Sequence, residues 1–115
     1  MHNKFLILPL LLLPLASLPA HADESGAWKH LDQAQAYMTA GEPRAALISL
    51  KNAAKAAPNN RDIRLELGRA YLKLGSPTEA AKELQKAVDL GIAHRVVAPP
   101  LAEALVATGE YQQVI

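Results

Sequence analysis

Apolar side chains recur at the helical period through most of this chain. Between residues 60 and 75 one apolar stripe has the spacing i, i+3, i+4 and i+7, which predicts an amphipathic helix. Its members are Leu67, Ala70, Tyr71 and Leu74. A second stripe follows, made of Ala80, Ala81, Leu84, Ala87 and Val88. Gly75 suits the left-handed conformation that ends a helix, and Pro77 suits the first turn of the next. The stretch is therefore predicted to be a helical hairpin.

This hairpin recurs with a period of 34 residues. The turn glycines align as Gly41, Gly75 and Gly109, and a small residue precedes each as Ala34, Gly68 and Ala102. A large residue lies nearer each turn, as Tyr37, Tyr71 and Leu105. A 34-residue helix–turn–helix period is typical of tetratricopeptide repeats, in which small residues allow two helices to approach closely. Gly68 is therefore expected to face the neighbouring helix of its own hairpin.

The central hairpin resembles the tetratricopeptide repeat family at Leu67-Gly68, Tyr71, Ala80, Leu84 and Ala87, and Pro58-Asn59-Asn60 resembles the residues that close a repeat. His30, Gln33 and Ile92 depart from the family pattern. The resemblance covers Ala27 to Ile115. It implies an all-α fold, a superhelix of stacked helical hairpins with about two and a half repeats.

The predicted organisation has five parts: a signal peptide over 1–22, a flexible lead over 23–26, repeats over 27–60 and 61–94, and a partial third repeat over 95–115. The first helix is expected from about Ala27 to Thr39. Asp62 is expected to accept hydrogen bonds where the second repeat begins. In the third repeat two prolines predict that firm helix begins around Pro99.

Residues 1–22 have the features of an export signal. Lys4 gives a positive start, residues 5–18 are apolar, and Ala20-His21-Ala22 has the small-residue pattern of a cleavage site. The apolar run contains two prolines and is shorter than the roughly 20 residues that span a bilayer. We therefore expect cleavage after Ala22 and a periplasmic protein without a stable membrane anchor. An uncleaved anchor is the alternative.

The chain ends inside a predicted repeat. Tyr111 to Ile115 would form the first turns of a helix whose remainder is missing. Repeat arrays need about three stacked units and a polar cap at the end. We therefore expect a C-terminal truncation of the reading frame, and a second chain that supplies the missing helix is the alternative.

No pattern of catalytic or ligand-binding residues is found. The absence of cysteine excludes disulfides, thiolate metal sites and a cysteine nucleophile. The sequence has no metalloprotease, phosphate-loop or serine-hydrolase motif, and His30 has no second metal ligand one turn away. Removal of Lys4 leaves 11 of the 12 basic side chains against 11 acidic ones, so nothing indicates nucleic-acid binding. We expect no enzyme activity, cofactor, metal or small-molecule substrate.

Binding of a protein or peptide is the activity that the family resemblance implies. In this family the first helix of each repeat lines a concave groove that holds extended peptides or partner helices. The corresponding positions here are Leu31, Gln35, Met38, Leu65, Arg69, Leu72, Lys73, Glu103 and Val106. Arg69 and Lys73 lie one helical turn apart, so the pair could hold a carboxylate. Ordinary amphipathic surface is the alternative interpretation.

Two classes of function fit these features. One is an exported interaction scaffold, and the alternative is the non-catalytic N-terminal segment of a longer envelope enzyme, such as a peptidase or synthase. The segments GSPTEAAKELQKAVDLG and PPLAEALVATGEYQQVI look like the N-terminal repeats of large tetratricopeptide proteins of PEP-CTERM/exosortase systems. Those proteins are associated with exopolysaccharide and biofilm gene clusters. This resemblance implies a role in polysaccharide assembly or export, or in surface-protein sorting.

Overall fold

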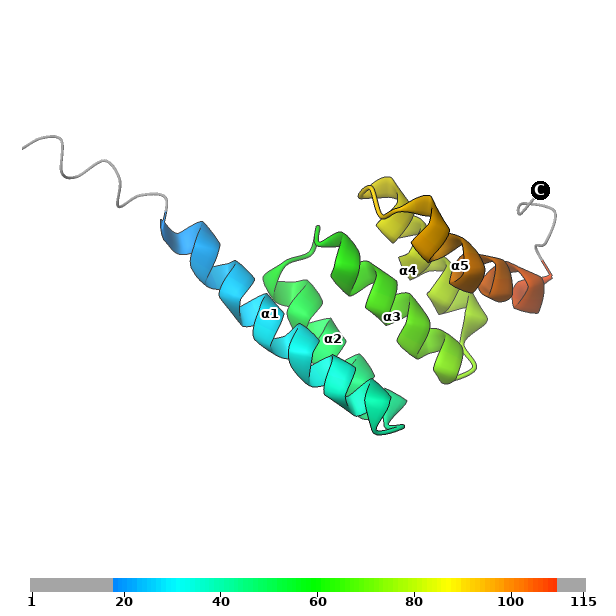
Figure 1. Ribbon diagram of the computed structural model, residues 1–115, viewed down its shortest axis with the longest axis horizontal. Coiled ribbons are helices and arrows are strands. Elements are labelled where there is room, and N and C mark those ends of the chain that lie inside the picture. Colours follow the sequence, from blue (N-terminus) through cyan, green and yellow to red (C-terminus); the bar gives the residue numbers. More distant parts are fainter. Residues whose placement is uncertain (1–17, 110–115) are drawn as a thin grey trace, which may run out of the picture.

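The chain folds into a row of antiparallel helical hairpins (Figure 1). The computed structural model describes residues 18–109, with side chains from residue 25 onward. This part of the chain forms five helices and no strand: α1 Leu18–Thr39, α2 Pro43–Ala56, α3 Arg61–Lys73, α4 Pro77–Asp89 and α5 His94–Thr108. The predicted all-α fold of stacked hairpins is confirmed.

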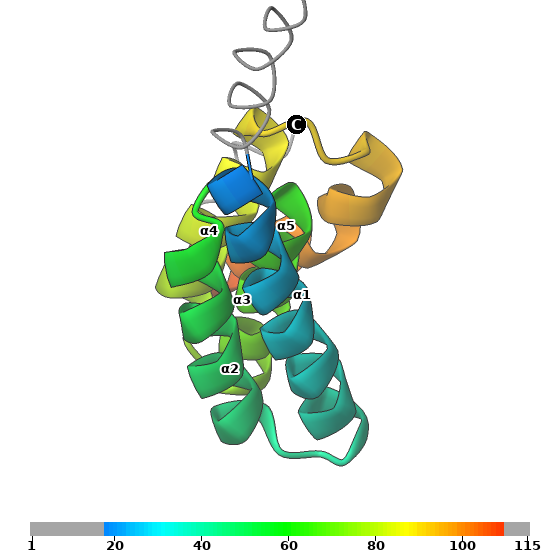
Figure 2. The same ribbon diagram turned by 90° about the vertical axis from the view of Figure 1, so that its left-hand side faces the viewer.

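The helices lie in two layers. Helix α1 pairs with α2, and α3 pairs with α4, while α5 packs against both α4 and α3. In the view of Figure 2, α2 and α4 lie on one side of the molecule and α1 and α5 on the other. The first helices α1 and α5 therefore share one face, and the second helices α2 and α4 share the opposite face.

The hairpin turns repeat one hydrogen-bonding pattern. After α3 the N–H of Gly75 donates to the carbonyl of Leu72 (3.1 Å), and the N–H of Ser76 donates to the carbonyl of Tyr71 (2.9 Å). The same pair of bonds follows α1 and α4, at the glycines that have φ values of 77° and 93°. This is the Schellman arrangement, in which a residue with positive φ satisfies the last carbonyls of a helix. The predicted role of Gly75 is confirmed.

Two apolar clusters form the core. The first lies between α1, α2 and α3 and includes Leu31, Leu50 and Ile63. The second lies between α3, α4 and α5 and includes Leu84 and Val97. Tyr71 of α3 packs against both clusters. Helix α3 is therefore the element that joins the two halves of the core.

The first helix begins earlier than expected. The sequence indicated a start near Ala27 after a flexible lead, but α1 begins at Leu18 and includes residues 23–26. Pro19 lies in its first turn, where a missing N–H costs nothing, and the alanine and glutamate that follow are good helix formers. Most of the predicted signal, residues 1–17, and the incomplete helix after residue 109 lie outside the described residues.

The third repeat also begins earlier than expected. Helix α5 starts at His94 rather than near Pro99, so both prolines lie inside it. Val97 is only 1% exposed, and its burial in the second core cluster anchors this first turn. Interior prolines are costly because they lack an N–H and crowd the preceding turn. Packing of Val97 outweighs that local preference.

The entry to α3 is capped by a different residue from the one expected. The side chain of Asn60 accepts hydrogen bonds from the N–H groups of Asp62 (2.9 Å) and Ile63 (3.1 Å). Asp62 is therefore a first-turn residue whose backbone donates, and the cap is Asn60. None of the helices within residues 18–109 combines the length and apolar character needed to cross a membrane.

Candidate peptide-binding groove

A groove of about 360 Å³ runs along the face shared by the first helices of the repeats. Helix α1 contributes one side chain, α3 contributes three and α5 contributes three. The lining residues are Met38, Arg69, Leu72, Lys73, Pro99, Pro100 and Glu103. Side chains that lie far apart in the sequence therefore meet in one concave surface.

Five of the nine predicted groove residues line this surface. They are Met38, Arg69, Leu72, Lys73 and Glu103. Gln35 and Val106 are exposed but lie outside the groove, and Val106 is 57% exposed.

Leu31 and Leu65 are not groove residues. Leu31 is 3% exposed and belongs to the first core cluster, and Leu65 is 5% exposed and belongs to the second. Each therefore faces the core and not the solvent. Their inclusion in a ligand-accessible groove is a wrong prediction, because an apolar stripe along a helix does not show which part a neighbouring helix covers.

The two sides of the groove carry opposite charges. On α3, Arg69 donates to Glu66 (2.8 Å, Nη1 to Oε1) and its side chain remains 42% exposed. Lys73 on α3 and Glu103 on α5 are exposed, and neither has an ion-pair partner among the described residues. Within that part of the chain, the groove therefore offers a free cation on one side and a free carboxylate on the other. Leu72 and Met38, both half-buried, supply apolar surface in the same groove.

Pro99 and Pro100 were missed as groove residues because the sequence was interpreted as placing them at a helix start. Their rings give the groove a rigid apolar side, since proline has a fixed φ and little freedom to lose on binding. Neither residue has an N–H, so the carbonyls of Arg95 and Val96 lack their usual i+4 donor. The apolar residue Val97 shortly before them was the sequence signal that could have placed both prolines inside the helix.

The described side chains were searched for a metal centre. Within residues 25–109 no group of three His, Asp or Glu side chains is placed to hold a metal ion. His30 is half-buried on α1, and its Nδ1 atom has no hydrogen-bond partner among the described residues. It lies in the helix whose Ala27 and Leu31 enter the core, which agrees with a packing role.

Stacked helical hairpins with a groove along their first helices define an α-helical repeat protein. The sequence model of the tetratricopeptide repeat matches residues 31–94, which is more than half of the chain, and the chain belongs to this family. Repeats of this family are typically non-catalytic scaffolds for protein–protein interaction.

Solved structures show the same fold. One similar structure is that of a point mutant of MamA, with a TM-score of 0.70, 22% sequence identity, and coverage of 77% of this chain. The match spans 65% of that chain, which is less than two thirds of its length. No curated protein sequence matches the chain. This structural likeness shows the fold and does not identify a binding partner.

Proposed function

We propose that this protein is an interaction scaffold whose groove on α1, α3 and α5 holds a segment of a partner protein. The observation that carries the proposal is the convergence of Met38, Leu72, Lys73 and Glu103 on one concave surface. Apolar side chains at the centre and unpaired charges at the sides are the arrangement that gives a peptide groove both affinity and register.

The groove suits an extended or helical segment better than a small molecule. It is open, and at about 360 Å³ it lies near the lower end of the size of drug-binding pockets. Its charged groups come from two neighbouring helices, α3 and α5. A segment with an apolar side chain near its centre, an acidic group toward Lys73 and a basic group toward Glu103 would satisfy all of them.

Selection from a displayed library of random peptides tests this function. We expect selected peptides to bind the chain with micromolar affinity and to lose about tenfold in affinity or more when Leu72→Ala is combined with Lys73→Ala. The matched control is Ile48→Ala with Lys82→Ala, which removes an apolar side chain and a lysine that lie outside the groove. Peptides that bind both double variants equally well would contradict the proposal.

We also propose that the protein acts after export. The support is the sequence of residues 1–22, with its charged start, apolar run and Ala20-His21-Ala22. Intact-mass measurement of the periplasmic protein is expected to give a chain that begins at Asp23. A chain that keeps Met1 in the membrane fraction would contradict export with cleavage.

A narrower assignment, to exopolysaccharide assembly or PEP-CTERM surface-protein sorting, is proposed on the sequence resemblance of residues 75–91 and 99–115 alone. Deletion of the gene is then expected to reduce the exopolysaccharide matrix or the surface display of sorted proteins, and complementation with the intact gene to restore it. A groove variant that complements as well as the intact gene would separate this role from the groove.

A further inference from the structure

A second groove of about 300 Å³ lies on the opposite face of the molecule, between α2 and α4. Lys51 and Lys55 of α2 and Glu83 of α4 line it, together with the half-buried Tyr71 of α3. Leu67 lies beneath these side chains and is 3% exposed, so it belongs to the core. This surface shares no lining residue with the groove on α1, α3 and α5. It is therefore a separate candidate for binding.

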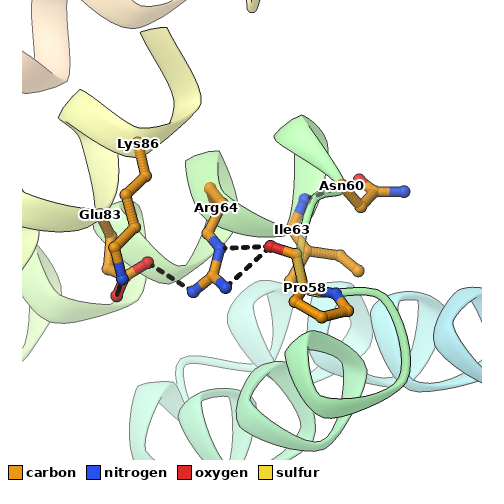
Figure 3. A network of polar contacts seen from close by, with 6 residues as sticks. All are labelled: Pro58, Asn60, Ile63, Arg64, Glu83 and Lys86. Carbon is orange, nitrogen blue, oxygen red and sulfur yellow. Dashed lines mark hydrogen bonds and ion pairs between the residues drawn. The ribbon is translucent and has the colours of Figure 1, made fainter. Parts of the chain in front are cut away.

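The charge in this second groove is unbalanced toward the positive. Arg64 and Glu83 form an ion pair (2.9 Å) in which the side chains are only 14% and 13% exposed, and Lys86 also contacts Glu83 at 3.4 Å (Figure 3). The Glu83 carboxylate is thus already compensated by two cations. Lys51 and Lys55 are exposed and have no ion-pair partner among residues 25–109.

Helix α2 offers these two lysines no acidic neighbour. Its residues include Arg44, Lys51 and Lys55 and neither Asp nor Glu. Lys51 and Lys55 are four residues apart, a spacing at which like charges repel on a helix surface. An anionic ligand would relieve this repulsion, whereas no group of the described chain does so.

We propose that this second groove binds an acidic, extended segment of a partner protein, with Lys51 and Lys55 pairing with carboxylates at alternate positions. Four residues of helix advance about 6 Å along its axis. Two residues of an extended strand advance about 6.6 Å, and their side chains point to the same side. The two lysines and an acidic-x-acidic segment therefore have matching spacing. The side chain between the two carboxylates points the opposite way, away from the lysines, so a small polar residue is accepted there.

A groove of this kind favours a peptide over an anionic membrane. Membrane recognition by charge uses clusters of about four to eight basic residues, each contributing about 1 kcal/mol near the surface. Helix α2 presents three, and two of them border a concave surface that a flat bilayer cannot enter.

The test is fluorescence anisotropy with the whole chain and a labelled peptide of alternating glutamate and threonine. Lys51→Ala with Lys55→Ala is expected to weaken binding by about tenfold, and added salt to weaken binding to the intact chain. The matched control, Lys29→Ala with Lys82→Ala, removes the same charge from two exposed lysines outside both grooves and is expected to leave affinity unchanged. Circular dichroism melts verify that both double variants are folded.

Three results would overturn this proposal. If the two double variants lose the same affinity for the peptide, the attraction is non-specific. If a peptide with glutamine in place of glutamate binds equally well, the groove does not recognise carboxylates. Vesicles of phosphatidylglycerol and phosphatidylcholine that bind through Lys51 and Lys55, while the peptide does not, would make the surface a membrane site. Arg69→Ala with Lys73→Ala is expected to leave the acidic peptide bound, which separates this groove from the one on α1, α3 and α5.

Discussion

A Cβ atom placed on Gly68 of α3 would lie 2.6 Å from Cδ2 of Leu84 on α4, and it would also meet the backbone carbonyl of Ala80 at 3.3 Å. Leu84 has no exposed surface, so it has little room to move away. The expectation that Gly68 faces its partner helix is confirmed. The contact also fixes the register of the α3–α4 hairpin, because only a residue without a side chain allows the two helices to approach so closely.

Gly68→Ala is therefore expected to destabilise the protein by about 1–2 kcal/mol, because overpacking outweighs the better helix propensity of alanine. Gly68→Leu is expected to cost more. The matched control is Gly26→Ala in α1, where an added Cβ meets nothing within 4 Å and the helix gains up to about 1 kcal/mol. Urea melts measure all three changes. A Gly68→Ala variant as stable as Gly26→Ala would mean that the hairpin contact is looser than described.

Burial distinguishes two arginine–glutamate pairs of nearly equal length. Arg64–Glu83 (2.9 Å) has side chains 14% and 13% exposed, whereas Arg69–Glu66 (2.8 Å) has an arginine 42% exposed. Arg64→Ala is expected to cost about 1–3 kcal/mol, because it removes two bonds to the Pro58 carbonyl and leaves Glu83 with Lys86 alone. Arg69→Ala is expected to cost about 0.5 kcal/mol or less.

Arg64→Lys keeps the positive charge and removes the guanidinium group, so it separates charge from hydrogen-bond geometry. A lysine cannot reproduce the paired donors that reach the Pro58 carbonyl and the third that reaches Glu83, so little rescue is expected. Chemical denaturation of Arg64→Ala, Arg69→Ala and Arg64→Lys measures the free energy of unfolding of each variant. If Arg64→Ala and Arg69→Ala cost the same, then burial of the Arg64 network does not contribute to stability.

The cap at the start of α3 gives a local prediction. Asn60→Ala removes the side-chain oxygen that accepts from two backbone N–H groups, and a loss of about 1 kcal/mol is expected. Asn59→Ala is the matched control, since Asn59 is an exposed turn residue that accepts no cap bond. Thermal melts of the pair should differ by several degrees. Equal melting temperatures would contradict the capping role.

The two prolines inside α5 predict a stabilising substitution. Pro99 is exposed and Pro100 half-buried, so replacing both by alanine removes little packing and restores two N–H donors to α5. An increase in stability of about 1–3 kcal/mol is expected. Pro77→Ala, at the start of α4 where the missing N–H costs nothing, is expected to give no such gain. A loss of stability in the double variant would mean that the proline rings pack more tightly than their exposure indicates.

The fold could be predicted from the repeat period because the residues that define the period act locally on the backbone. A glycine at each turn and a glycine at the hairpin contact specify backbone geometry that the sequence shows directly, as Gly75 and Gly68 do. The groove was predictable only in part. Leu72 and Leu65 both lie on the apolar side of α3, and only the packing of α4 and α5 decides that Leu65 is covered and Leu72 remains accessible. The early start of α5 depends on burial of Val97 in a core that other helices build. Local sequence patterns do not show this packing, so they could not predict the start.

Site-specific photo-crosslinking in living cells can show whether the groove on α1, α3 and α5 holds the partner. A photoreactive amino acid is placed at Met38 or Glu103 in the groove, and at Lys29 or Lys82 outside both grooves. We expect one discrete crosslinked protein from the groove positions, little from the outside positions, and loss of the adduct on adding Leu72→Ala with Lys73→Ala. Crosslinks of equal yield from Lys82 and Met38, unaffected by that double substitution, would mean that this groove does not hold the partner.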